Sequence, residues 1–164
     1  IIVVAAAIAF FLNTFIIANS RVPSGSMENT IMTGDRVIGS RLSYKFHEPE
    51  RGDIAIFHFP DDPTGKTLYV KRIIGLPGET VDIVDSQVYI NGEPLDEPYI
   101  REPMDPEEPM HFEVPEGCYF MMGDNRNYSS DARYWHNHYV AEDQIIAKVL
   151  FRYYPFSKIS WLDE

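Results

Sequence analysis

The sequence predicts a mostly-β domain, a barrel or a folded antiparallel sheet, attached to one N-terminal helix. Residues 1–20 carry no charge, whereas all 14 Lys and Arg and all 25 Asp and Glu residues lie from Arg21 onward. Beyond that point, short runs rich in β-branched and aromatic residues recur, and Gly and Pro clusters separate them. A helical period is weak after residue 20. We therefore expect a helix over residues 1–20 and a single domain over residues 21–164.

The N-terminal run "IIVVAAAIAFFLNTFIIA" is almost entirely apolar. As a helix, residues 1–18 would span roughly 27 Å, close to the hydrocarbon thickness of a bilayer. A cleavable signal peptide has a similar length, and a buried core helix is a second alternative. A core helix in a small domain should carry a polar stripe, which this run lacks, so we interpret it as a membrane anchor. The chain begins at Ile1 without a methionine, and we expect residues upstream of it.

The strands are predicted from apolar, β-branched segments between turn residues. Asp85 and Ser86 separate two of these segments and indicate a hairpin. The stretch from Glu97 to Phe112 is acidic and rich in proline, and we interpret it as a long surface connection because strands continue on both sides. The predicted strands cover residues 52–59, 67–75, 79–84, 87–92, 111–115, 118–123 and 144–154.

The composition excludes several classes of partner. A net charge of −11 disfavours nucleic acid, which requires clustered Lys and Arg, and it also disfavours a polybasic contact with lipid. Cys118 is the single cysteine, so no internal disulfide can form, and a small buried hydrophobe is the simplest role for it. The histidines of "WHNHY" are spaced i and i+2, and no nearby Cys or carboxylate completes a ligand set. We therefore expect neither a metal site nor a cofactor.

The stretch "RVPSGSMENT" places Ser26 between small residues directly after the apolar run. A serine nucleophile needs a base, which is usually histidine, but the first histidine of the chain is His47. Lysine is the alternative, because burial can lower the pKa of its amine by several units. Lys71 lies in "LYVKRIIG", where strand alternation places it on one face with Tyr69 and Ile73. Taken alone, a lysine in a strand usually faces solvent.

A third polar segment, "MGDNRNYSSDARYW" from Met122 to Trp135, follows an apolar strand. Its density of Gly, Asp, Asn and Ser is typical of an ordinary turn-rich loop. Loops placed at the end of a core strand are also where functional sites are commonly built.

The ordered set "VPSGSMENTI", "RGDIAIF", "YVKRIIGLPGE" and "MGDNRNYSSDARYW" behind an apolar helix resembles the bacterial type I signal peptidases. The similarity extends to "IIAKVLFRYYPFSKISWL" and so covers nearly the whole chain. The compact spacing is similar to the short, single-anchor form of Gram-positive bacteria. Two positions depart from the usual pattern of that family, Asn29 in place of proline and Ala132 in place of serine.

The resemblance implies roles for individual residues. Ser26 matches the nucleophile and Lys71 the general base of a Ser/Lys dyad. The Ser24 hydroxyl and the Ser26 amide match the oxyanion hole. Ser129 matches a serine that orients the lysine amine, supported by an ion pair between Asp131 and Arg133. The residues that match the lining of pockets for small substrate side chains are Val22, Pro23, Met27, Ile31, Tyr69 and Val70.

The function implied by the resemblance is that of a membrane-bound serine endopeptidase. It would remove N-terminal signal peptides from exported preproteins after small residues in the A-x-A pattern. Its partners would be these signal peptides and the lipid bilayer, with one pass through the plasma membrane and the catalytic domain on the extracytoplasmic face. One rival is a soluble Ser/Lys self-cleaving repressor-type peptidase, but residues 1–20 cannot form its DNA-binding domain. Another is a catalytically inactive anchored β-domain that serves as a binding or assembly subunit.

Overall fold

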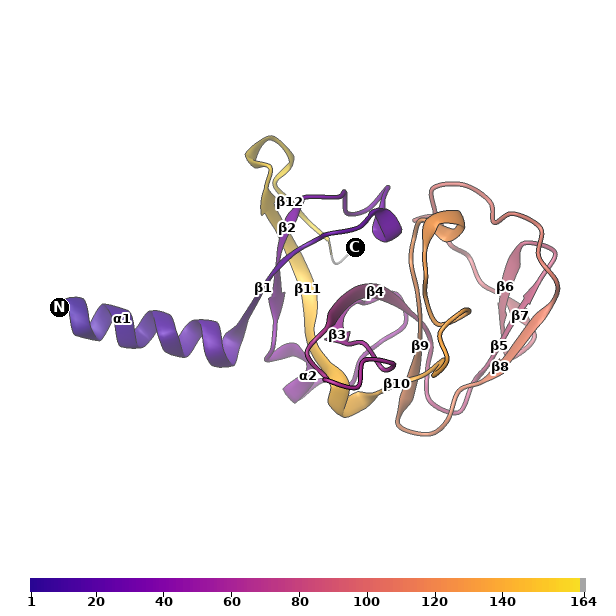
Figure 1. The fold of residues 1–164 in the computed structure, drawn as a ribbon, viewed down its shortest axis with the longest axis horizontal. Coiled ribbons are helices and arrows are strands. Elements are labelled where there is room, and N and C mark those ends of the chain that lie inside the picture. The colour runs from indigo at the N-terminus through magenta and orange to yellow at the C-terminus, as the bar shows by residue number, and fades with distance from the viewer. Residues whose placement is uncertain (163–164) are drawn as a thin grey trace.

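The computed structural model describes residues 1–162 and contains two antiparallel sheets with a helix at the N-terminus (Figure 1). The larger sheet has eight strands in the order β1-β2-β11-β3-β4-β9-β10, with β12 paired to β11, and the smaller has the order β7-β6-β5-β8. The prediction of a mostly-β domain of folded antiparallel sheets is thus confirmed. The strands are β1 (Ile17–Arg21), β2 (Arg36–Ser40), β3 (Ile54–His58), β4 (Leu68–Gly75), β5 (Thr80–Val84), β6 (Gln87–Ile90), β7 (Glu93–Pro94), β8 (Met110–Glu113), β9 (Cys118–Met122), β10 (Val140–Ala141), β11 (Ile145–Tyr154) and β12 (Ser160–Trp161).

The helical elements are few and short. The first, α1 (Ile2–Phe11), continues into a π-helical turn, η1 (Leu12–Ile16), and the second is α2 (Ser43–Phe46). Four 3-10 turns complete the set: η2 (Gly25–Met27), η3 (Arg126–Tyr128), η4 (Glu142–Gln144) and η5 (Phe156–Lys158).

The N-terminal helix is shorter than the predicted span of residues 1–20. Residues from Ile17 to Arg21 instead form β1, which pairs with β2 from Ile17–Ser40 to Arg21–Arg36. Asn19 and Ser20 are weak helix formers, and the β2 edge offers their backbone groups regular partners. None of the helices within residues 1–162 has the length and apolarity needed to cross a bilayer. Asp163 and Glu164, at the end of the predicted domain, lie outside the described residues.

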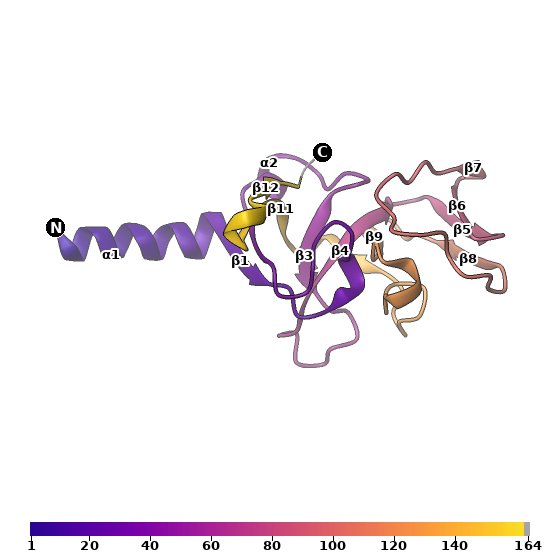
Figure 2. The ribbon, with the colours of Figure 1, turned by 90° about the horizontal axis from the view of Figure 1, so that it is seen from above.

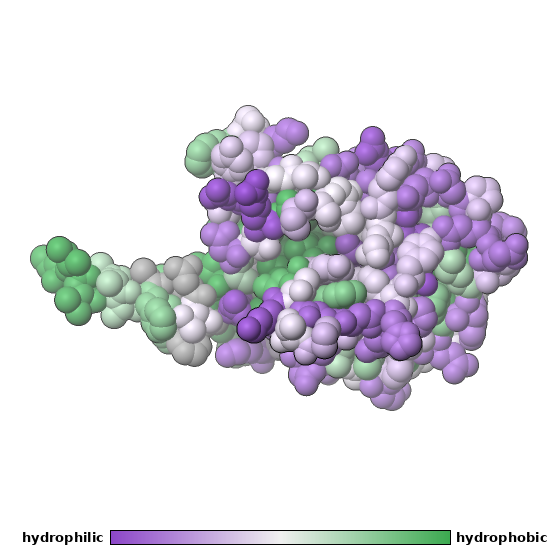
Figure 3. Space-filling model, viewed as in Figure 1, coloured by the Kyte–Doolittle hydropathy of each residue, from purple (hydrophilic) through white to green (hydrophobic). Residues whose placement is uncertain are grey.

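The helix leads away from one end of the domain, and the smaller sheet lies at the opposite end in both ribbon views (Figures 1 and 2). Apolar side chains cover the outer end of the helix, and a further apolar area lies on the face of the domain next to the base of the helix (Figure 3). The exposed hydrophobic side chains at this end include Phe10 and Phe11 of the helix, and η5 and β12 add Phe156 and Trp161.

Two hydrophobic clusters form the core. The larger lies against both sheets and includes Phe57, Phe120 and Trp135. The smaller includes Val22, Met27 and Ile31, together with strand residues such as Val37 and Ile54. Fully burying a residue such as Met27 or Ile31 contributes about 1.5–3 kcal/mol. This burial anchors the loop that follows β1.

The turn between β5 and β6 is the hairpin predicted at Asp85 and Ser86. Both residues have positive φ, 50° and 63°, as a two-residue type I′ turn requires. The acidic, proline-rich segment from Glu97 runs without regular strand until β8 begins at Met110. The predicted long connection is therefore present. The strand that follows it, β8, begins at Met110, one residue before the predicted start at residue 111.

Candidate active site

Ser26 lies in the 3-10 turn η2, five residues after β1 ends at Arg21. The backbone of Val22 holds the start of this loop, because its N–H donates to the Asp35 carbonyl at 3.0 Å and its carbonyl accepts from Gly34 at 2.9 Å. Met27, the next residue after Ser26, is completely buried. The Ser26 side chain is therefore carried on a turn whose two ends are fixed in the core.

Lys71 lies in the middle of β4, opposite Ala55 of β3. Its side chain crosses to η2, where Nζ lies 2.5 Å from Ser26 Oγ. Nζ is also 5.5 Å from the centre of the Tyr69 ring, as expected for two residues on one strand face. Lys71 is only 4% exposed, so the usual solvent-facing arrangement of a strand lysine does not apply.

The environment of Lys71 favours its neutral amine. Burial lowers the pKa of Lys71 from 10.5 to about 8, and the positive charge of Arg133 acts in the same direction. The charges of Asp131 and Asp124 oppose this by raising the pKa. Within residues 1–162, Lys71 forms no ion pair, so the loss of hydration is the larger effect. A useful fraction of the amine is neutral just above pH 7.

The loop after β9 supports this corner through Asp131. The Asp131 carboxylate accepts from Arg133 Nε at 2.8 Å and from the Gly123 N–H at 3.0 Å. The Asp131–Arg133 ion pair predicted from the sequence is therefore present, and both side chains are buried. Through these bonds Asp131 joins the beginning and the end of the loop after β9 beside Lys71.

Ser129 lies in the same loop and is 6% exposed, but the predicted bond to the lysine amine is not formed. Ser129 Oγ finds no hydrogen-bond partner within residues 1–162. The Lys71 amine is directed at Ser26 Oγ instead. Ser129 is thus a buried neighbour of the site in this structure.

Gly123 is a site residue that the sequence reasoning missed. A Cβ atom at this position would lie 2.2 Å from Ser129 Oγ and 2.4 Å from the Ser26 carbonyl oxygen. Real Cβ atoms do not approach backbone oxygen so closely, and only glycine fits here. The signal in the sequence was the glycine that directly follows the predicted strand ending "CYFMMG".

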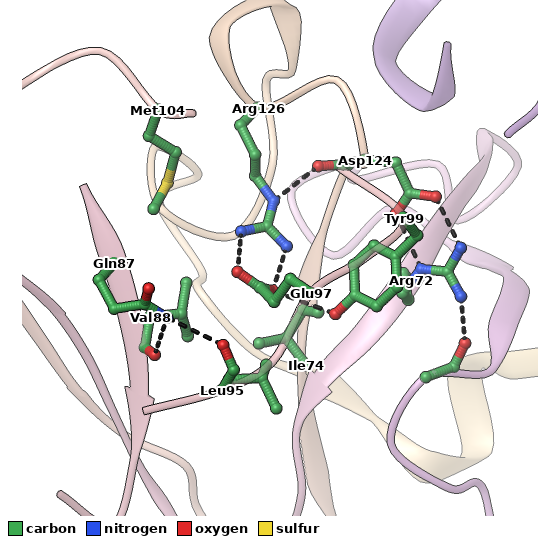
Figure 4. A network of polar contacts seen from close by, with 12 residues as sticks. Arg72, Ile74, Gln87, Val88, Leu95, Glu97, Tyr99, Met104, Asp124 and Arg126 are labelled. Carbon is green, nitrogen blue, oxygen red and sulfur yellow. Dashed lines mark hydrogen bonds and ion pairs between the residues drawn. The ribbon is translucent and has the colours of Figure 1, made fainter. Parts of the chain in front are cut away.

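A second polar network lies beside the site (Figure 4). Arg72 binds Asp124 through two hydrogen bonds of 2.8 and 2.7 Å. Arg126 binds Glu97 in the same two-bonded manner, at 2.9 and 2.5 Å. Tyr99 donates to Glu97 at 3.0 Å, and its ring lies under the Arg72 guanidinium. The network ties the proline-rich segment to the loop after β9.

A cavity of about 560 Å³ opens at the Ser26–Lys71 pair. One wall comes from the chain between β1 and η2, and the other from the first half of β4, with the loop after β9 closing one side. The lining residues are Ser20, Arg21, Val22, Pro23, Ser24, Ser26, Leu68, Tyr69, Val70, Lys71, Tyr128 and Ser130.

The structure divides the six predicted substrate-binding residues into two groups. Val22, Pro23, Tyr69 and Val70 line the cavity. Met27 and Ile31 are absent from its lining, because both are fully buried in the smaller core cluster. Their role in this structure is to support the loop that carries Ser26.

The two departures from the family pattern have simple local explanations. Asn29 has a φ of 92°, which a proline ring cannot adopt, and its side chain donates to the Tyr99 carbonyl at 3.1 Å. Ala132 is completely buried, and its N–H donates to the Met121 carbonyl. Neither residue contacts the Ser26–Lys71 pair through a hydrogen bond.

Comparison with known proteins assigns the chain to a class and to a family. A crystal structure of a signal peptidase I from Enterococcus faecalis V583 superimposes with a TM-score of 0.52 at 35% identity, covering 62% of this chain and 97% of that one. The chain is thus a peptidase, and therefore a hydrolase. It belongs to the family described as signal peptidase, peptidase S26, whose sequence profile matches residues 1–154.

Several relatives support this assignment over most of their length. Signal peptidase I-1 of Synechocystis sp. is 40% identical over 163 residues, covering 96% of this chain and 82% of the relative. Signal peptidase I of Leptolyngbya laminosa is 38% identical over 94% of this chain and 77% of its own. Signal peptidase IB of Staphylococcus aureus is 32% identical over 98% of this chain and 90% of its own. The chain is a peptidase of the kind that cleaves signal peptides.

Proposed function

We propose that this chain removes N-terminal signal peptides from exported preproteins with Ser26 as nucleophile and Lys71 as general base. The single observation that carries the proposal is the distance of 2.5 Å between Lys71 Nζ and Ser26 Oγ, with the lysine buried. A pKa of about 8 for Lys71 allows its amine to accept a proton near neutral pH.

In the acylation step, Ser26 Oγ attacks the carbonyl carbon of the scissile peptide bond while its proton passes to Nζ of neutral Lys71. The Ser26 N–H and the Ser24 hydroxyl stabilise the negative charge that develops on the carbonyl oxygen. The proximity of the Ser24 and Ser26 hydroxyl oxygens, 3.3 Å apart, supports this assignment for Ser24. The Lys71 ammonium then protonates the leaving amine.

In the deacylation step, the neutral amine of Lys71 takes a proton from a water molecule that attacks the ester carbon. The ester bond breaks, and Ser26 Oγ regains its proton from Lys71. Both steps use only protein groups and water, so the proposed reaction requires no metal and no cofactor.

The substrate is proposed to bind in an extended form along the first half of β4. Residues from Leu68 to Lys71 pair with β3 on one side, while the pairing with β9 on the other side begins only at Arg72. This leaves a free strand edge that faces the cavity, and an extended peptide can add to such an edge. The side chains of Val22, Tyr69 and Val70 at the cavity favour small residues at the first and third positions before the cut.

The apolar N-terminal segment is proposed to anchor the chain once in the plasma membrane, with the domain on the extracytoplasmic face. Residues 1–20 contain no charge, and α1 leads away from the domain with its apolar side chains exposed. Only four residues separate β1 from Ser26, so the nucleophile would lie near the lipid surface where a membrane-inserted signal peptide ends. The bilayer is then a partner in presenting the substrate.

The experiment that tests this function compares the wild-type chain with Ser26→Ala in cleavage of a preprotein. We expect cleavage by the wild-type and none by the variant, whose fold is checked by circular dichroism. Ser157→Ala is the matched control, because it removes a serine hydroxyl from the exposed turn η5. Equal cleavage by Ser26→Ala and the control would favour the alternative hypothesis, a non-catalytic anchored β-domain.

The proposed selectivity is tested with peptides that differ only at the residue before the cut. Alanine should be cleaved and phenylalanine should not, because we propose that Tyr69 and Val70 bound a part of the cavity that accepts only a small apolar side chain. Overfilling a packed site costs about 1–3 kcal/mol, so discrimination in kcat/KM of roughly tenfold or more is expected. Equal kcat/KM values for the two peptides would contradict the proposed pocket.

A further inference from the structure

Asn125 lies directly behind the turn that carries Ser26, although its sequence position is about a hundred residues away. Its backbone N–H donates to the Ser26 carbonyl at 3.0 Å. Its side-chain Nδ2 donates to the Gly25 carbonyl at 2.8 Å. One residue therefore holds the carbonyl groups of two consecutive residues, of which the second is the proposed nucleophile.

Only one of the two polar atoms of the Asn125 side chain, Nδ2, forms a hydrogen bond within residues 1–162. Asn125 is 2% exposed, and its Oδ1 finds no hydrogen-bond partner within residues 1–162. A buried polar group without a partner costs about 1–3 kcal/mol. An asparagine at this position thus lowers the stability of the fold. What distinguishes it from an apolar residue is the hydrogen bond from its Nδ2 to the Gly25 carbonyl.

The bond to Gly25 determines where the Ser26 N–H points. A trans peptide unit is planar, and its C=O and N–H point in opposite directions. The Gly25 carbonyl is fixed by two donors, Asn125 Nδ2 and the Glu28 N–H at 3.1 Å. Fixing this carbonyl therefore also fixes the N–H of Ser26, which belongs to the same peptide plane.

The surfaces on the two sides of this peptide agree with that orientation. Gly25 and Asn125 line a second hollow, together with Glu28 and Arg101. Ser26 instead lines the cavity that contains Lys71. The carbonyl is held on the side of Asn125, and the N–H faces the side on which the scissile carbonyl would bind.

We propose that Asn125 is a positioning residue that aims the Ser26 N–H at the oxyanion formed during catalysis. The inference rests on the proposed function, since it assigns a partner to the backbone donor of that mechanism. Asn125 does not touch the reacting atoms, and its effect reaches them through the Gly25–Ser26 peptide. A misaligned donor lowers the stability of the transition state more than that of the bound substrate.

The inference predicts a loss confined to kcat. Substitution Asn125→Ala should lower kcat about 10- to 100-fold, the size of effect expected from a displaced oxyanion donor. KM should stay at the wild-type value. The midpoint of the pH profile should also stay, because burial and the charges of Asp131, Asp124 and Arg133 set the pKa of Lys71, and the neutral Asn125 amide is not among them.

The experiment measures kcat, KM, the pH profile and the melting temperature of the full chain on one short peptide substrate. Asn125→Asp is the second variant, because it keeps the size of the side chain but replaces the donor with an acceptor that repels the Gly25 carbonyl. Asn127→Ala is the matched control. It removes the same amide group from the same loop, where it bonds to Glu102 and Pro103 and not to η2. The control should keep the wild-type kcat.

Ser26→Ala, measured in the same series, separates the possible failures. An inactive Ser26→Ala beside Asn125 variants with wild-type kcat would overturn the inference and leave the proposed function standing. A Ser26→Ala variant as active as the wild-type would remove the proposed function and the inference together. A loss in Asn125→Ala that appears in KM, or with a displaced pH midpoint, would assign the substitution a general structural effect and would also overturn the inference.

Discussion

Lys71 and Arg72 are neighbours on β4, each 4% exposed, but they lie in regions that treat a buried positive charge in opposite ways. Arg72 points into the network of Figure 4 and binds both oxygens of Asp124, while its Nη1 donates to the Gly52 carbonyl at 2.7 Å. Lys71 points into the cavity and contacts the Ser26 hydroxyl, with no ion pair within residues 1–162. Strand alternation is sufficient to separate the two faces.

The different partners of Arg72 and Lys71 explain how one strand can hold a charged arginine beside a lysine that readily loses its proton. A buried cation with a two-bonded carboxylate keeps its charge, whereas burial without such a partner favours the uncharged amine. The change in the pKa of Lys71 from 10.5 to about 8 corresponds to a free-energy difference of roughly 3 kcal/mol between its two protonation states. The network side supports the fold, and the cavity side is where we propose that proton transfer takes place.

The largest expected effect comes from replacing Lys71, the buried cation on the cavity side of β4. Lys71→Ala should abolish cleavage to the extent that Ser26→Ala does, a loss of at least about 1,000-fold in kcat. Because the two residues act as one unit, the double variant should be scarcely slower than either single variant. Rates for all three variants on a preprotein, beside circular dichroism spectra, provide the measurement. Near-normal turnover by a folded Lys71→Ala variant would contradict the proposed Ser26–Lys71 dyad.

The next effect is on stability, and it should differ in sign between the two sides. Asp124→Asn leaves Arg72 buried without its charged partner, and the free energy of unfolding should fall by about 3–5 kcal/mol. Lys71→Met replaces a buried amine with an apolar side chain of similar length, and the free energy of unfolding at pH 7 should rise by about 1–3 kcal/mol. Urea unfolding of both variants is the measurement.

The sign for Lys71 follows from its lowered pKa. At pH 7, below the folded value of about 8, the amine must carry its proton while buried, so the folded state is destabilised relative to the unfolded state. This penalty shrinks as pH rises through the range between the folded and unfolded pKa values and is gone above the latter. The advantage of Lys71→Met should therefore disappear above pH 10.5. A clear destabilisation by Lys71→Met at pH 7 would show that the amine is better accommodated than its surroundings indicate.

A smaller effect concerns the pH dependence of the rate. The value of kcat/KM should rise from acid toward alkaline pH with a midpoint of about 8, as Lys71 loses its proton. The negative charge of Asp124 raises the pKa of Lys71, so Asp124→Asn should move the midpoint to lower pH. Initial rates of both proteins across a pH series are the measurement. A midpoint that moves upward in Asp124→Asn would contradict the link between the two regions.

The smallest effect on the site itself is expected from truncation, because the residues that line the cavity begin only at Ser20. A chain without residues 1–16 keeps the whole of β1 and should cleave a short soluble peptide at the wild-type rate. Cleavage of a preprotein in vesicles should fall by about tenfold or more, since the truncated enzyme loses the raised effective concentration of the lipid layer. Equal loss on both substrates would mean that the helix acts on the fold or on the site. Truncation after Asn19 is less informative because it also removes three β1 residues.

Much of the fold could be predicted because the strand pattern was local. The runs around Ile54, Lys71 and Met121 alternate or are continuously apolar between turn residues, and the Asp85–Ser86 turn has a distinctive composition. The short strand β1 could not be predicted, since its residues continue an apolar run that is typical of a helix. It becomes a strand only because β2, some twenty residues later, provides an edge to pair with.

The candidate site was predictable in its chemistry but not in its supports. Ser26 and Lys71 were named from the resemblance, and their contact depends on long-range pairing that no local pattern contains. Gly123 and Asn125 lie in a loop of ordinary turn composition, and their importance follows from how closely that loop approaches η2. Ser129 shows the reverse case, a role expected from the resemblance that depends on a side-chain bond absent from this structure.

We propose above all that burial lowers the pKa of Lys71 to about 8, so that a useful fraction of its amine is neutral near physiological pH and can take the proton of Ser26. The most direct test of this proposal is an NMR titration of the Lys71 side chain in the folded chain, assigned by comparison with Lys71→Met. We expect a midpoint of about 8 for Lys71. A Lys71 midpoint at 10.5 would contradict it, because the amine would then be protonated throughout the range in which the proposed base must act.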